Sequence, residues 1–215
     1  MNSFSKFEST NDALRFFMVE WMLSHMRSCA CCGRWFEPVD WLCTGCESRL
    51  FRRIEKVQVK VIHPAYSLFY LWDWRPEDRN MKTIVESLKG GRPRVAFAKI
   101  ATLFYFLHPQ SPQRWDAIYY PSKGTKDHAY EWAQILGQLI GCPSYPLRTM
   151  SRRKQAKLPK SERQKIQFLP QAPKGQRLLF VDDIVTSGAT ARGAFEALGQ
   201  PKNFAVWAPF YRRLL

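Results

Sequence analysis

A chain of 215 residues can form one full-sized domain with a small additional module. Its 46% hydrophobic and 14% aromatic residues exclude a chain that is disordered throughout, and no apolar run reaches the roughly 20 residues that span a bilayer. The formal net charge of +15 favours polyanions such as nucleic acids or phosphorylated ligands as partners, although a basic surface that serves only solubility explains it equally well. The first residues lack the features of a secretory signal, so we expect a cytoplasmic protein.

The first part of the chain joins an amphipathic segment to a cysteine-rich one. Residues 11–27 have apolar residues at helical spacing and predict a helix that packs on the body or on a partner subunit. Five of the six cysteines lie between positions 29 and 46, and without an export signal this clustering favours metal over disulfides. Two C-x-x-C pairs are typical of a tetrahedral structural zinc site, which we expect on Cys29, Cys32, Cys43 and Cys46.

The fifth cysteine of this segment leaves the ligand set open. Cys31 could pair with Cys29 or replace a ligand, but the glycine after Cys32 permits the turn of a zinc knuckle and favours Cys29 and Cys32. Reduced cysteines without metal are the alternative, and Cys142 is expected to be a packing residue. Three aromatic residues of the segment could pack inward or stack on nucleobases: Trp35, Phe36 and Trp41.

The rest of the chain predicts an α/β body. An antiparallel strand pair is expected at residues 57–61 and 65–71, followed by helices at 77–88 and 95–107. From residue 115 strands alternate with helices, which is typical of a parallel sheet. The expected strands are 116–120, 145–149, 176–181 and 204–208, the expected helices are 129–140 and 189–198, and a loop at 121–126 and a polar, basic segment at 151–165 lie between them.

One motif, LLFVDDIVTSGAT at residues 178–190, carries most of the chemistry. The apolar run before Asp182 predicts a buried central strand, so Asp182 and Asp183 must emerge at its carboxyl edge, where open α/β sheets bind ligands. Small residues, hydroxyls and the start of a helix then suit a phosphate, and they comprise Thr186, Ser187, Gly188, Ala189 and Thr190. Carboxylates for a vicinal diol and a loop for a phosphate together describe a ribose 5-phosphate.

The acidic pair has three other interpretations. Asp182 and Asp183 could simply cap the turn and the helix that follow them. They could be the acidic pair of a receiver domain, but too few residues follow Asp183 to form that fold. They could also be a Walker-B-like pair, but the chain contains no G-x-x-x-x-G-K-[ST] loop to accompany it. The ribose-phosphate interpretation explains both the acids and the small residues after them.

The sequence VDDIVTSGAT closely resembles the phosphoribosyl pyrophosphate (PRPP) signature of type I phosphoribosyltransferases. From about residue 29 to 208 the chain resembles the ComF family of competence proteins. This likeness includes the cysteine-rich segment, a helix ending in LKGG, a loop after the strand at 116–120, and an arginine- and glutamine-containing segment before the signature. The resemblance implies a type I phosphoribosyltransferase-like parallel sheet flanked by helices, and a role in uptake of transforming DNA, during which single-stranded DNA enters the cytoplasm.

The resemblance also implies roles for individual residues. Asp182 and Asp183 would hold the ribose hydroxyls, with Mg²⁺, and residues 186–190 would bind the 5-phosphate. The pyrophosphate loop would contain Ser122, Lys123 and Gly124. The sequence departs from the family at residues 126–129, where KDHA replaces an Arg-Gly-Phe-Asn-like run, so Lys126 or His128 would have to substitute for the arginine.

A mobile basic loop is a further feature that the resemblance implies. It would close over pyrophosphate or contact nucleic-acid phosphates, with a solvated loop as the alternative. Its candidate residues are Arg152, Arg153, Lys154, Gln155 and Arg163.

These expectations divide the chain into an N-terminal helix at 1–28, a four-cysteine zinc-finger module at 29–55 and a phosphoribosyltransferase-like domain at 56–215. The expected function is that of a ComF-like protein that binds PRPP, acts in natural transformation and handles single-stranded DNA, alongside a DNA-uptake helicase or recombination proteins. An active phosphoribosyltransferase of nucleobase or nucleotide metabolism without a DNA role is the alternative. No acceptor site or general base is evident in the sequence, so catalysis stays open. A metal-stabilised interaction module with a vestigial phosphate site is a third possibility.

Overall fold

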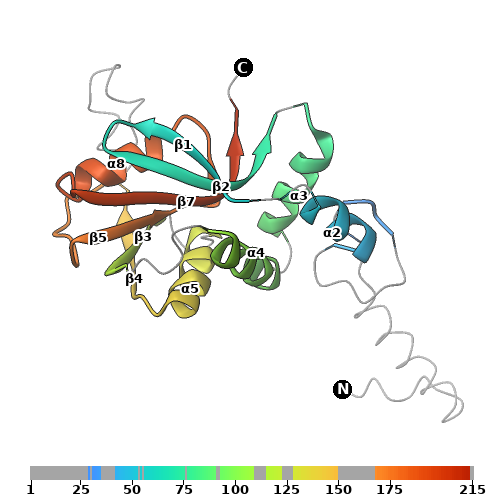
Figure 1. Cartoon of the computed structure of the whole chain (residues 1–215), viewed down its shortest axis with the longest axis horizontal. Coiled ribbons are helices and arrows are strands. Elements are labelled where there is room, and N and C mark those ends of the chain that lie inside the picture. The colour runs from blue at the N-terminus through green and yellow to red at the C-terminus, as the bar shows by residue number, and fades with distance from the viewer. Residues whose placement is uncertain are drawn as a thin grey trace, which may run out of the picture.

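The computed structural model shows a mixed α/β body in which helices cover a twisted, mostly parallel sheet (Figure 1). The fold class expected from the sequence is therefore confirmed. The predicted helix at 11–27 and three aromatic residues (Trp35, Phe36 and Trp41) lie outside the described residues. The structure describes residues 29, 31–34, 42–52, 54, 56–75, 77–90, 93–108, 115–122, 128–149 and 168–213.

The sheet has seven strands in the order β1-β2-β7-β5-β3-β4, and the short β6 also pairs with β7. Among the strands that the structure describes, only β1 and β2 pair antiparallel, as the sequence predicted, and the other neighbours are parallel. Parallel pairing brings the carboxyl ends of β3, β4, β5 and β7 to the same edge of the sheet. The strands are β1 (Gln58–His63), β2 (Tyr66–Trp74), β3 (Ala117–Ser122), β4 (Ser144–Arg148), β5 (Arg177–Val181), β6 (Ile184–Val185) and β7 (Asn203–Arg212).

Helices cover both faces of this sheet. Alternate residues of β7 point to opposite faces, so Trp207 joins the hydrophobic cluster under α4 and α5, whereas Val206 joins the one under α8. Figure 1 shows α8 on one side of the strands and α4 and α5 on the other. The helices are α2 (Thr44–Phe51), α3 (Arg79–Gly90), α4 (Pro93–Leu107), α5 (His128–Ile140) and α8 (Ala189–Ala197).

The cysteine-rich segment packs against this body through α2. The indole N–H of Trp72 on β2 donates to the Leu50 carbonyl at 3.2 Å, and the Phe51 ring stacks on Trp72 with centroids 6.0 Å apart. Leu50 belongs to the same hydrophobic cluster as the helices of the body, and so do two of the cysteines, Cys43 and Cys46. The domain boundary at residue 55 stays a prediction, but the residues on its two sides form one continuous core.

Two features differ from the expectations. Pro121 and Ser122 belong to β3 rather than to a loop, because they pair with Leu147 and Arg148 of β4. The motif also contains an unpredicted strand, β6, which pairs with the end of β7 beyond the expected limit of residue 208. Because its end pairs with both β2 and β6, β7 stays buried and continues past residue 208. None of the helices in the described ranges is long and apolar enough to cross a membrane.

Candidate functional site

The acidic pair lies where the sequence places it, directly after a fully buried strand. Leu178 to Val181 of β5 expose none of their surface, Asp182 is 9% exposed and Asp183 is half-buried. The parallel β3–β5 register pairs Tyr119 with Phe180. Ser122, which ends β3, and the two acids, which follow β5, therefore share the carboxyl edge of the sheet.

Hydrogen bonds within the turn orient both carboxylates. One oxygen of Asp182 accepts the N–H of Asp183 at 3.0 Å, and one oxygen of Asp183 accepts the N–H of Ile184, also at 3.0 Å. The Asp182 N–H itself donates to the Trp207 carbonyl of β7 at 3.2 Å, which anchors the turn to the sheet. In each case the side chain accepts the N–H of the next residue, a local hydrogen bond that an aspartate or an asparagine can form. The second carboxylate oxygen of Asp183 could serve a diol or a cation.

The loop after β6 has the geometry of an anion-binding turn. Gly188 is the N-cap of α8 with φ +75° and ψ 7°, so the backbone turns sharply just before the helix. In the described part of the chain, the backbone N–H groups of Thr186, Ser187 and Gly188 meet no backbone acceptor. The Ser187 hydroxyl caps the Ala189 N–H at 3.4 Å. Free N–H groups at a helix N-terminus are suited to bind a phosphate.

The β1–β2 hairpin lies over residues 186–188, the candidate phosphate loop. A Cβ atom added to Gly188 would come within 3.3 Å of Ile62 Cδ1 on β1, so a side chain there would require Ile62 to shift by a few tenths of an ångström. On the same strand, the Lys60 ammonium donates to the Tyr211 hydroxyl and lies 4.2 Å from the centre of that ring. Tyr211 pairs with Val185 of β6, which directly precedes the phosphate loop. Lys60 is thus a basic group near the site that sequence reasoning missed, because 151 residues separate it from its partner.

The remaining predicted ligand residues are only partly described. His128 begins α5, whereas Lys123, Gly124 and Lys126 lie outside the described residues, as do the five candidates of the basic loop between Arg152 and Arg163. The described residues on either side of those candidates meet, however. An antiparallel bridge joins Thr149 and Phe168 just past the end of β4. Both residues therefore lie at the carboxyl edge of the sheet.

The structure gathers four cysteines into a compact group: Cys29, Cys32, Cys43 and Cys46. Their sulfurs all lie within 4.8 Å of one another, and those of Cys32 and Cys43 are 3.7 Å apart. Zinc–sulfur bonds of about 2.3 Å in a tetrahedron place sulfurs about 3.8 Å apart, so the donor set fits a zinc ion. Gly33, with φ +68°, donates its N–H to the Cys29 carbonyl at 2.9 Å and closes the first knuckle.

The environment of the sulfurs also suits a cation. Burial opposes ionisation of Cys29, but backbone N–H groups of Cys43, Cys32 and Cys31 outweigh it and lower the pKa of this thiol to about 6. Burial and the neighbouring sulfurs of Cys32 and Cys43 raise the pKa of Cys46, and Arg49 opposes them. Coordinating thiols are deprotonated and would repel one another, and the charge of a bound cation would offset this repulsion. The four cysteines can therefore hold a metal such as zinc. All four members of the group are cysteines, so the group itself offers no carboxylate that could activate a water molecule.

Comparisons with known proteins give structural likenesses only. No family model matches the chain, and no curated protein matches it significantly. Similar solved structures include a hypothetical protein from Neisseria gonorrhoeae with bound ppGpp, at 14% identity and TM-score 0.39 over 57% of this chain and 79% of that one. Hypoxanthine phosphoribosyltransferase of Trypanosoma cruzi is 13% identical, at TM-score 0.38 over 56% of this chain and 73% of that one. Adenine phosphoribosyltransferase of Trypanosoma brucei, in complex with AMP, pyrophosphate and ribose-5-phosphate, is 9% identical, at TM-score 0.40 over 74% and 87%.

Proposed function

We propose that the carboxyl edge of the sheet binds PRPP with Mg²⁺. The observation that carries this proposal is the sequence of groups along one turn: two oriented carboxylates, Asp182 and Asp183, followed by the open N–H groups of residues 186–188 at the start of α8. The carboxylates would hold the ribose hydroxyls, and residues 186–190 would hold the 5-phosphate. Ser122, Lys123 and Gly124 would contact pyrophosphate, and the basic loop between residues 152 and 163 would close over it.

We further infer a ComF-like role in DNA uptake. The resemblance of the signature and of the cysteine-rich segment supports it, and the net charge of +15 would attract single-stranded DNA. Lys60, Tyr70 and Tyr211 add basic and aromatic groups at the same end of the sheet, with the two tyrosine rings 5.2 Å apart. Zinc on the four cysteines would hold α2 in place as a structural element and supply no chemistry to the reaction.

Calorimetric titration of the protein with PRPP and MgCl₂ tests the ligand assignment. The double variant Asp182→Asn, Asp183→Asn keeps an acceptor oxygen for each turn hydrogen bond, so the fold is retained while both negative charges are lost. We expect its PRPP affinity to fall by about a hundredfold or more, because charge-assisted hydrogen bonds to two groups are removed. Glu196→Gln on the exposed face of α8 is the matched control. Unchanged affinity in the double variant would refute the assignment.

Assays of turnover and of DNA binding distinguish an active phosphoribosyltransferase from a DNA-handling protein that only binds PRPP. An active phosphoribosyltransferase would release pyrophosphate from PRPP in the presence of one of a panel of nucleobases. A DNA-handling protein would bind PRPP without turnover and bind single-stranded DNA with an affinity that falls steeply with salt. A flat salt dependence would remove the electrostatic argument for DNA, and pyrophosphate release would establish the enzyme.

A further inference from the structure

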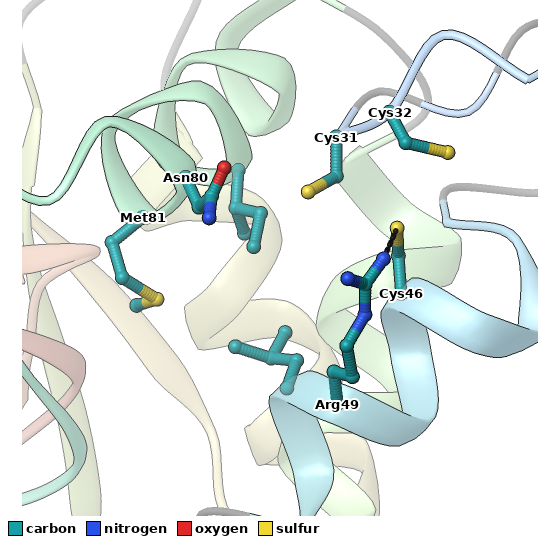
Figure 2. A pocket seen from close by; sticks show the side chains of 8 residues that line it. Cys31, Cys32, Cys46, Arg49, Asn80 and Met81 are labelled. Atoms are coloured by element: carbon teal, nitrogen blue, oxygen red, sulfur yellow. Dashed lines mark hydrogen bonds between the residues drawn. The ribbon is translucent and has the colours of Figure 1, made fainter.

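A fifth cysteine lies beside the four-cysteine group without belonging to it. Cys31 is half-buried, whereas its neighbour Cys32 is exposed and is one of the four. Both cysteines border a pocket of about 310 Å³ that is open to solvent between the cysteine-rich segment and α3 (Figure 2). The lining residues are Cys31, Cys32, Cys46, Arg49, Leu50, Asn80, Met81 and Ile84.

Across this pocket the natural partner of Cys31 is Cys46. Both residues line the pocket, and Figure 2 shows the Cys31 sulfur on the loop and the Cys46 sulfur on α2 at the two sides of the space between them. Cys32 is a poor partner, because adjacent Cα atoms are about 3.8 Å apart and disulfides need about 4.4 Å or more. The Arg49 guanidinium donates to the Cys46 sulfur at 3.1 Å, which places a positive charge beside the pair.

We propose that Cys31 is an oxidation site at which hydrogen peroxide forms a Cys31–Cys46 disulfide and so takes one ligand away from the four-cysteine metal site. The Cys31 sulfur attacks one peroxide oxygen, the O–O bond breaks, and the second oxygen leaves as water, which gives a sulfenic acid. The Cys46 sulfur then attacks the Cys31 sulfur, the S–O bond breaks, and the hydroxyl leaves as a second water with a proton from solvent. The two sulfurs lose two electrons and the peroxide gains them.

Loss of the metal site would weaken the packing of α2 against the body of the protein. Leu50, Met81 and Ile84 are 4%, 3% and 4% exposed, and they pack α2 against α3 behind the pocket. Three ligands hold a structural zinc far less tightly than four, so oxidation would free the loop and loosen this contact. Trp72, which binds the Leu50 carbonyl, would report the change through its fluorescence.

The test is a peroxide titration of the zinc-loaded, full-length protein. Zinc release is followed with a metallochromic dye, and disulfides are mapped by mass spectrometry after alkylation of free thiols. We expect one zinc released per chain together with a Cys31–Cys46 disulfide, and recovery of bound zinc after treatment with dithiothreitol and zinc. In Cys31→Ser, which keeps all four ligands, we expect stoichiometric zinc in the reduced protein and release that is at least about tenfold slower.

Cys142→Ser is the matched control, because it removes a buried thiol that neither lines the pocket nor belongs to the four-cysteine group, and it should release zinc at the original rate. Equal release from Cys31→Ser and the original protein would overturn the proposal, as would a disulfide between two of the four clustered cysteines alone. Absence of zinc from the reduced protein, or its loss in Cys31→Ser before oxidation, would overturn it too. These outcomes do not depend on PRPP binding.

Discussion

The glycines at the two ends of α8 offer a matched pair of substitutions that isolates the phosphate loop. Gly188 precedes the helix with φ +75°, and Gly199 follows it with φ +74°. An alanine Cβ at Gly199 would meet nothing within 4 Å, whereas at Gly188 it would come within 3.3 Å of Ile62 Cδ1. Both substitutions therefore share the cost of a left-handed backbone, and only Gly188→Ala adds a contact with the hairpin over the site.

The expected magnitudes follow from these two contributions. Left-handed backbone costs an alanine roughly 1–2 kcal/mol, so Gly199→Ala should lower the melting temperature by about 2–8 °C in a chain of this size. Gly188→Ala should cost about 1 kcal/mol more, because Ile62 must move away from a carbon closer than the optimal 3.5–4.0 Å. We expect the added Cβ also to shift the backbone of the loop and so to change the direction of its N–H groups. We therefore expect the PRPP affinity of Gly188→Ala to fall at least about tenfold.

Thermal unfolding followed by circular dichroism and calorimetric titration with PRPP and MgCl₂ measure the two effects separately. Gly199→Ala should bind PRPP as the original protein does, despite its lower stability. PRPP binding by Gly188→Ala with unchanged affinity would refute the argument that this loop holds the phosphate. Equal loss of affinity in both variants would show that the effect comes from the helix and not from the loop.

Three further predictions concern stability and metal content. Burial lowers the pKa of His108 to about 4, so unfolding takes up a proton between about pH 6.5 and pH 4. The free energy of unfolding should therefore fall by roughly 3 kcal/mol as the pH drops through that range. In urea unfolding His108→Phe should lack this pH-dependent contribution, and an identical pH dependence in the variant would contradict the prediction. Cys43→Ser should lose bound zinc by elemental analysis and unfold at a lower urea concentration, because structural zinc contributes folding energy; full zinc occupancy would argue against Cys43 as a ligand. Gly175→Ala should cost about 2–4 kcal/mol in urea unfolding, because its Cβ would lie 2.3 Å from that of Asp116 at φ +116°; a cost below about 1 kcal/mol would show that the turn adapts.

Much of the fold could be predicted because its elements are set by local patterns. The uninterrupted apolar run Leu178–Val181 required a strand that is buried on both faces, and Asp182 could then only emerge at its end. The two C-x-x-C pairs fixed a local geometry in the same way, and Cys29 and Cys32 are the members of the first pair that the structure groups with the second. In both cases neighbours in sequence decide the outcome.

What could not be predicted depends on contacts between distant parts of the chain. β6 exists only because β7 runs past residue 208 and offers a second edge, which no pattern within Ile184–Val185 indicates. The position of Ile62 over Gly188, and of Lys60 at Tyr211, requires the hairpin to fold across the sheet. Such contacts are set by the packing of the whole domain, so the residues that surround the phosphate loop had no signal of their own in the sequence.

The position of the ligand is the central claim, and a crystal structure of the protein with PRPP and Mg²⁺ tests it most directly. We expect the 5-phosphate on the N–H groups and hydroxyls of residues 186–190, and the ribose hydroxyls on Asp182 and Asp183. Pyrophosphate should lie toward Ser122, at the neighbouring end of β3. PRPP bound elsewhere on the protein, or a loop that stays empty at saturating PRPP, would contradict the account.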